Sequence, residues 1–247
     1  MENLKKTEIL GVCFDNLLPE AACERFLELA KTNEPSTVFT PNPEMVMLAR
    51  KDDGFKALLN SADLLVPDGI GIVLASRLTK NRIRQRVAGI ELLQNIFGDE
   101  RAKKHKWYFL GGKPNVAQLA KENVEKQFEG LEVVGSRDGY FGAEDENEVI
   151  ADIIASGADI VLVGLGFPRQ ERWINAHKDQ IGAKLYMGVG GSFDVLSGQL
   201  KRAPKAFRKL GMEWLWRLLR QPSRMWRQRV LVKFAFVVLF KKIRGVL

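Results

Sequence analysis

Short runs of β-branched and aromatic residues alternate along the chain with longer stretches whose apolar residues recur at spacings of three and four. The short runs predict strands and the longer stretches predict helices, because these spacings match the periods of the two structures. Strands are expected at residues 8–14, 37–40, 63–66, 107–110, 131–134, 159–164 and 184–189, and the expected helices include 21–30, 90–101, 116–128 and 148–155. This alternation is typical of an α/β fold.

Several predicted strands are apolar throughout, as at residues 160–163. Strands of this kind lie in the middle of a parallel sheet that helices cover on both faces. We therefore expect a Rossmann-like parallel or mixed sheet layered with helices, over residues 1–200. The Lys-rich stretch at residues 103–106 marks a candidate boundary between two half-units of this core.

The chain changes character after residue 200. Residues 201–247 hold 14 of the 38 Lys and Arg residues and one acidic residue, Glu213, so this segment carries a charge of +13. It also holds three of the five Trp residues. We expect one or two basic amphipathic helices here, broken at Pro222, that form an appendage to the core. Such a segment favours an anionic partner.

Composition excludes several classes of protein. With 247 residues, 46% of them hydrophobic, the chain is long enough for a sizeable core, which excludes a disulfide-stapled miniprotein. Cys13 and Cys23, with only two His residues, supply neither a disulfide framework nor a zinc site, which favours a reduced cytosol. The chain shows no signal peptide, and its longest apolar stretch, interrupted by Lys233, is shorter than the ~20 residues that span a bilayer. A cytoplasmic protein is expected.

Three common phosphate-binding motifs are missing. There is no Walker sequence, and the Gly-rich stretch at residues 164–169 lacks the last glycine of the dinucleotide fingerprint. Kinase, NTPase and simple dehydrogenase functions therefore lose their main support. No Asp-x-Asp sequence occurs, so the chain lacks the motif that holds a metal ion on the diphosphate of a nucleotide sugar. An anionic leaving group would need protein cations or helix N-termini instead.

Four polar motifs follow predicted strands, where open α/β sheets bind ligands. They begin at Thr40 and Val66 and at the glycines 164 and 188. For Asn42 in the first motif and Asp68 in the second, capping of a helix is the simpler interpretation. In the third motif, Arg169 opposes the helix dipole, which indicates that it is held for a ligand. The fourth contains more glycines than a tight turn needs.

Taken in order, these motifs resemble those of the WecG/TagA/CpsF family of bacterial glycosyltransferases. The resemblance covers residues from about 11 to 229 and rests on Thr-Pro-Asn-Pro-Glu (40–44), Pro-Asp-Gly (67–69), Arg-Val-Ala-Gly (86–89), Leu-Gly-Gly (110–112), Gly-Tyr-Phe (139–141), Gly-Phe-Pro-Arg-Gln-Glu (166–171), Gly-Val-Gly-Gly-Ser-Phe-Asp (188–194), Lys-Arg-Ala-Pro (201–204) and Glu-Trp-Leu-Trp-Arg-Leu (213–218). One position departs from the family, because Glu91 stands where an Asp is usual.

The resemblance implies an inverting, metal-independent transfer of a sugar from a UDP donor, without a cofactor. N-acetylmannosamine as the sugar and N-acetylglucosamine on undecaprenyl diphosphate as the acceptor, in the linkage unit of a wall teichoic acid, are the first expectation. Donors carrying the uronic acid form, glucose or glucuronate stay open, in which case the product is an exopolysaccharide or surface antigen. The enzyme would lie on the inner face of the cell membrane, as a peripheral protein.

The resemblance also implies roles for individual residues. Asp68 resembles the catalytic base, Thr40 and Asn42 line the same pocket, and Arg86 holds the substrates. The remaining candidates are nucleotide contacts at Tyr140, Gln170 and Asp194, and tail arginines that close onto diphosphate groups, at Arg217, Arg224 and Arg227.

The residues themselves agree with this chemistry. Direct displacement needs a carboxylate near the acceptor hydroxyl, where Asp68 stands, and positive charge for the departing UDP, which the tail supplies. A basic, Trp-rich tail also suits an anionic membrane surface. Two nonenzymatic alternatives stay open, a nucleic-acid-binding protein whose tail grips phosphates and a nucleotide sensor anchored by its tail. The oligomeric state, a homo-oligomer included, is also open.

Overall fold

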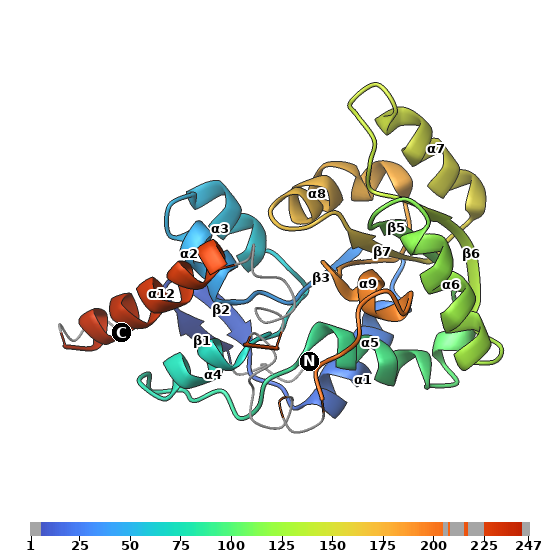
Figure 1. Cartoon of the computed structure of the whole chain (residues 1–247). Coiled ribbons are helices and arrows are strands. Elements are labelled where there is room, and N and C mark those ends of the chain that lie inside the picture. The colour runs from blue at the N-terminus through green and yellow to red at the C-terminus, as the bar shows by residue number, and fades with distance from the viewer. Residues whose placement is uncertain (1–5, 205–206, 208–214, 217–224, 244–247) are drawn as a thin grey trace.

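A two-stranded antiparallel hairpin precedes a six-stranded parallel sheet in the computed structural model, which describes residues 6–204, 207, 215–216 and 225–243 (Figure 1). The hairpin consists of β1 (Lys6–Ile9) and β2 (Val12–Asp15). The sheet consists, in spatial order, of β4 (Leu64–Leu65), β3 (Ser36–Phe39), β8 (Leu185–Gly188), β7 (Ile160–Gly164), β5 (Lys106–Gly111) and β6 (Glu132–Arg137). All neighbouring strands of this sheet pair in parallel, which confirms the expected α/β class.

Helices cover both faces of the sheet. One layer contains the hairpin and α2 (Pro43–Ala49), α3 (Asp53–Asn60), α4 (Ile70–Ser76), α7 (Glu146–Ser156), α8 (Arg169–Ile181) and α12 (Met225–Ile243). The other contains α1 (Pro19–Leu29), α5 (Gly89–Phe97), α6 (Val116–Gln127) and α9 (Ser192–Leu196), with the short 3-10 helix η1 (Ala102–Lys104) beside it.

The central strands of the sheet are largely apolar because each layer buries alternate residues of the same strand. In β7, Ile160 and Leu162 belong to the core on one face of the sheet, whereas Val161 and Val163 belong to the core on the other. Each strand is thus held by two separate hydrophobic layers, and its polar residues are left at its ends.

The prediction of one strand over residues 8–14 is wrong. The chain turns at Leu10 and Gly11, whose φ angles are 54° and 90°, and returns as the second strand of the hairpin. Apolar residues continue through the turn, since Leu10 is itself buried, so the sequence pattern hides it. The other six predicted strands are confirmed, with ends that shift by at most three residues.

The basic tail contributes to the core. Phe234 and Val238 of α12 are buried in the layer that contains α2 and α4, and Figure 1 shows α12 beside α2. The expectation of a helix in the tail is confirmed for residues 225–243, while the expected break at Pro222 lies outside the described residues. None of the described helices combines the length and apolarity needed to cross a membrane. The half-unit boundary at residues 103–106 stays a prediction.

Candidate active site

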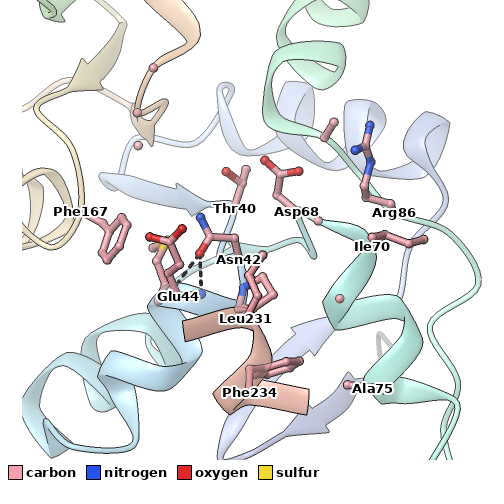
Figure 2. A pocket seen from close by; sticks show the side chains of 18 of the residues that line it. Thr40, Asn42, Glu44, Asp68, Ile70, Ala75, Arg86, Phe167, Leu231 and Phe234 are labelled. Atoms are coloured by element: carbon pink, nitrogen blue, oxygen red, sulfur yellow. Dashed lines mark hydrogen bonds between the residues drawn. The ribbon is translucent and has the colours of Figure 1, made fainter. Parts of the chain in front are cut away.

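A cavity of about 1120 Å³ opens where β3, β4, β7 and β8 end (Figure 2). Its position follows from the order of the strands. Neighbouring strands β3 and β8 continue into helices on opposite faces of the sheet, α2 in one layer and α9 in the other. Two neighbouring strands whose connections leave toward opposite faces of the sheet have a crevice between those connections, and this crevice is the usual ligand site of an open α/β sheet.

Three of the predicted motifs are bonded to one another at this edge. The backbone N–H of Asp68 donates to the carbonyl of Pro41 at 3.1 Å, and the N–H of Val87 donates to the carbonyl of Pro67 at 3.0 Å. As a result Thr40, Asn42, Asp68 and Arg86, which the sequence predicted as one group, all line the cavity. In Figure 2 the side chains of Thr40 and Asp68 lie next to each other, with Arg86 on the far side of Asp68.

Asn42 has two tasks. Its Oδ1 accepts hydrogen bonds from the backbone N–H groups of Glu44 at 2.8 Å and Met45 at 3.1 Å, so it is the N-cap of α2. The capping interpretation is therefore confirmed, although the side chain also lines the cavity. Because the oxygen is committed to the helix, the amide N–H2 is the remaining hydrogen-bonding group of the Asn42 side chain.

Asp68 is not in the capping position that the simpler interpretation gave it. Gly69, with a φ of 97°, is the N-cap of α4, and a side chain on it would lie 3.4 Å from Pro43. Gly71 is closer still, since a Cβ there would lie 2.9 Å from Pro43. These glycines bring α4 against the start of α2, and the half-buried Asp68 stands at the junction of the two helices, inside the cavity.

Glu91 holds Arg86 in place. Its Oε2 lies 3.7 Å from Nη2 of Arg86, and its Oε1 accepts a hydrogen bond from Nη2 of Arg202 at 2.7 Å. Arg202 also donates to Gln94 at 2.9 Å. The carboxylate that departs from the family pattern thus bridges two arginines, positions one of them at the cavity and fastens residues 201–204 to α5.

Gln170 fastens the loop that follows β8. Its Oε1 accepts from the N–H of Gly190 at 2.9 Å, and its Nε2 donates to Oε1 of Glu171 at 2.7 Å. The fit is close, because a Cβ at Gly188 would lie 2.9 Å from Nε2 of Gln170. Gln170 and Asp194, both predicted from the sequence, line the cavity on this side.

Glu171 was not predicted from the sequence. It is fully buried, and its Oε2 has no hydrogen-bond partner among the residues that the structure describes. Burial raises its pKa to about 7, against the hydrogen bond from Gln170, which lowers it. Its position in the first turn of α8, directly after Gln170 and a buried strand, was the signal that could have identified it.

Tyr140 does not join this group. Its side chain is 70% exposed, and it is not among the residues that line the cavity. Arg169 holds its loop, because its guanidinium donates to the carbonyls of Gly139 and Phe141, both at 3.1 Å, and stacks over the Phe141 ring. The guanidinium expected to bind a ligand is thus used within the protein. A nucleotide contact at Tyr140 stays a prediction.

The tail arginines give no test of their predicted role. Arg217 and Arg224 lie outside the described residues, and of Arg227 only the backbone, in α12, is described. The side chains that the described part of the tail adds to the cavity are apolar. Leu231, Phe234 and Val238 of α12 line it, opposite the polar residues that follow β3 and β4 (Figure 2).

The fold and the site define an α/β protein whose polar groups gather at one crevice, at the carboxyl ends of its parallel strands. Its family is shown by comparison with known proteins. The model of the Glycosyl transferase WecG/TagA/CpsF family matches residues 7–246, and this chain belongs to that family. It is therefore a glycosyltransferase, and the two nonenzymatic alternatives are not supported.

Three similar proteins carry the name N-acetylglucosaminyldiphosphoundecaprenol N-acetyl-beta-D-mannosaminyltransferase. The protein from Bacillus spizizenii is 37% identical over 207 residues, which are 84% of this chain and 80% of that protein. The protein from Bacillus subtilis strain 168 is 35% identical, over 83% of this chain and 79% of its own. The protein from Staphylococcus aureus strain MRSA252 is 34% identical over 238 residues, 96% of this chain and 93% of its own.

Glu171 is expected to make stability depend on pH. Between its ordinary pKa of 4.5 and its folded pKa of about 7, the folded protein keeps a proton that the unfolded chain loses, so stability falls as pH rises through this window. The loss amounts to about 3 kcal/mol above pH 7. Glu171→Gln removes this loss, so its stability relative to the wild type should rise by that amount between pH 4.5 and 8, as measured by urea unfolding.

The exposed Glu129, changed to Gln, provides the matched control and should show a constant difference from the wild type. A Glu171→Gln protein whose difference from the wild type is the same at both pH values would contradict the assignment.

Proposed function

We propose that this protein transfers N-acetylmannosamine from a UDP donor, with inversion and without a metal, to N-acetylglucosamine on undecaprenyl diphosphate. The product would be the linkage unit of a wall teichoic acid. The observation that carries the proposal is the gathering of Asp68, Thr40, Asn42 and Arg86 in one crevice of a family glycosyltransferase. The printed names of the relatives support this sugar and this acceptor.

Asp68 is the base in the proposed reaction. Its carboxylate takes the proton of the acceptor hydroxyl while that oxygen attacks the anomeric carbon of the donor sugar, and the bond to UDP breaks on the opposite face. Thr40 and the Asn42 amide would orient the acceptor sugar. The cavity exceeds the ~300–1,000 Å³ usual for a single small ligand, in keeping with two substrates held together.

The donor would lie on the side of Gln170 and Asp194. Asp194 is a poor partner for a diphosphate, because like charges repel, so its carboxylate would instead accept hydrogen bonds from the ribose or the uracil. The diphosphate needs cations, which Arg86 and the tail arginines Arg217, Arg224 and Arg227 would supply as negative charge develops on UDP.

Metal-independent chemistry is part of the same proposal. It rests on the lack of an Asp-x-Asp sequence in the chain. Within the described part of the protein, moreover, no three His, Cys, Asp or Glu side chains gather in a way that could hold a metal ion. Protein cations are therefore proposed for the task that a divalent ion performs in other nucleotide-sugar enzymes.

The outward face of α12 supports a place on the membrane surface. Val232, Phe236, Leu239, Phe240 and Ile243 are all at least half exposed, and their spacing of three and four residues puts them on one stripe of the helix. Basic residues accompany this stripe, and an apolar face beside Lys and Arg is how an interfacial helix binds an anionic bilayer. We propose attachment to the inner face of the cell membrane.

Asp68→Asn is expected to lower kcat by ~10²–10⁴, because the variant keeps the shape of the side chain but cannot accept the proton. The unfolding midpoint and the affinity for UDP should stay close to the wild type. Transfer is measured with a panel of UDP-sugars and undecaprenyl-diphosphate-linked N-acetylglucosamine, and Asp53→Asn on the exposed start of α3 is the control. Near-wild-type turnover by Asp68→Asn would exclude it as the base.

Gln170→Ala should weaken UDP binding about tenfold, because it releases the Gly190 N–H that shapes the donor side and removes one hydrogen-bonding side chain. Calorimetric titration with UDP provides the measurement. Gln118→Ala, on the exposed face of α6, should bind UDP like the wild type. Equal affinities for all three proteins would remove Gln170 from the donor site.

Replacing Phe236 and Phe240 together by Ser should lower binding to anionic liposomes by at least about tenfold, since both are exposed on the stripe that is proposed to enter the bilayer. Binding should also weaken with salt. The control replaces Leu119 and Ile154, exposed apolar residues of α6 and α7, in the same way. Point variants are preferred to removal of the tail, because removal would uncover core around Phe234. Sedimentation with liposomes that ranks the two double variants equally would contradict the proposal.

A further inference from the structure

The cavity has two chemically different ends. Thr40, Asp68 and the glycines after β8 form a polar end at the edge of the sheet. The other end lies between α4 and α12 and is lined by apolar side chains, at Ile70, Leu74, Leu78, Leu231, Phe234, Ala235, Val238 and Leu239. Figure 2 shows Leu231 and Phe234 of α12 across the cavity from Thr40 and Asp68, with α4 alongside.

Part of this apolar wall is exposed to solvent rather than packed against other side chains. Leu74 is 47% exposed and Leu239 is 51% exposed, although both line the cavity. Exposed apolar surface that forms one end of a reaction cavity calls for an apolar ligand, since its burial from water is what makes such a contact favourable. A UDP-sugar and the sugar of the acceptor are polar along their whole length. The only apolar part of the proposed substrates is the isoprenoid chain.

The apolar end also continues onto the outer surface. Val232 and Leu239 belong both to the cavity and to the outward stripe of α12. A chain that leaves the cavity between α4 and α12 therefore emerges on the face proposed to lie on the bilayer. This is the path that a lipid tail must take if its diphosphate and sugar are lifted to Asp68 while the rest of the chain stays in the membrane.

We infer that the wall between α4 and α12 is a binding groove for the isoprene units next to the diphosphate of the acceptor. This inference rests on the proposed function, which names a polyprenyl-diphosphate acceptor, and adds where the lipid is bound. Leu74 of α4 and Leu231 of α12 form its two sides. The groove orients the acceptor, because a chain seated there points its head group into the cavity, with the sugar toward Asp68.

The test compares two acceptors, N-acetylglucosaminyl diphosphate on undecaprenol in detergent and the same head group on a short alkyl chain in solution. For Leu74→Ser and Leu231→Ser, the KM for the undecaprenyl acceptor should rise relative to the KM for the short acceptor by about tenfold or more. Leu119→Ser, which changes an exposed leucine of α6 outside the cavity, should leave this ratio unchanged. An unchanged ratio in both groove variants overturns the inference.

A second measurement does not need turnover. A prenyl diphosphate without a sugar, with a diazirine on its second isoprene unit, is photolysed with the full chain. Adducts are expected at residues 70–78 and 230–239, and unlabelled undecaprenyl diphosphate should compete for them. Adducts elsewhere in the chain, as would follow if the protein's own residues 205–224 filled the groove, overturn the inference. If the wild type transfers sugar to neither acceptor but these adducts form, the groove stands and the proposed function fails.

Discussion

The divergence of β3 and β8 is the constraint on which the rest of the structure depends. The two strands are paired in parallel, yet one continues into α2 on one face of the sheet and the other into α9 on the opposite face. Their loops cannot pack against each other, so the sheet edge stays open between them. On one side of this opening, Gln170 accepts a hydrogen bond from the N–H of Gly190 and so holds the loop after β8. On the other side, the hydrogen bond from the N–H of Asp68 to the carbonyl of Pro41 joins the loops after β4 and β3.

Among the described residues, the carboxylates of Glu44, Asp68 and Asp194 line the crevice together with Arg86, so the surroundings of these groups decide how much negative charge a leaving group meets. Arg86 lies beside Glu91, which is itself shared with Arg202, so the arginine is paired with a carboxylate that does not itself line the cavity. On the other side, burial raises the pKa of Glu171 to about 7 and lowers its negative charge near neutral pH. An anionic nucleotide would meet less repulsion as a result.

Much of the site could be predicted from the sequence, because carboxyl ends of parallel strands share one edge. Thr40, Asn42, Asp68, Gln170 and Asp194 each follow a strand. Arg86, which only the family resemblance predicted, lies in a loop bonded to the loop after β4, and all six residues line the cavity. The turn at Leu10 was hidden by apolar residues on both sides of it, and the task of Arg169 depends on a distant loop. The wall formed by α12 was also missed, because the sequence predicted an amphipathic helix for an anionic surface, and the spacing of its apolar residues does not show which core residues a second apolar face would meet.

The central claim is that a single carboxylate, Asp68, activates the acceptor for direct displacement of UDP. The configuration of the product tests this most directly. With an α-linked UDP-N-acetylmannosamine donor, the one-bond carbon–proton coupling at the new anomeric centre, measured by NMR, should identify a β linkage. An α-linked product would mean that the configuration is retained, which a one-step displacement from the face opposite UDP cannot give, and would contradict the claim.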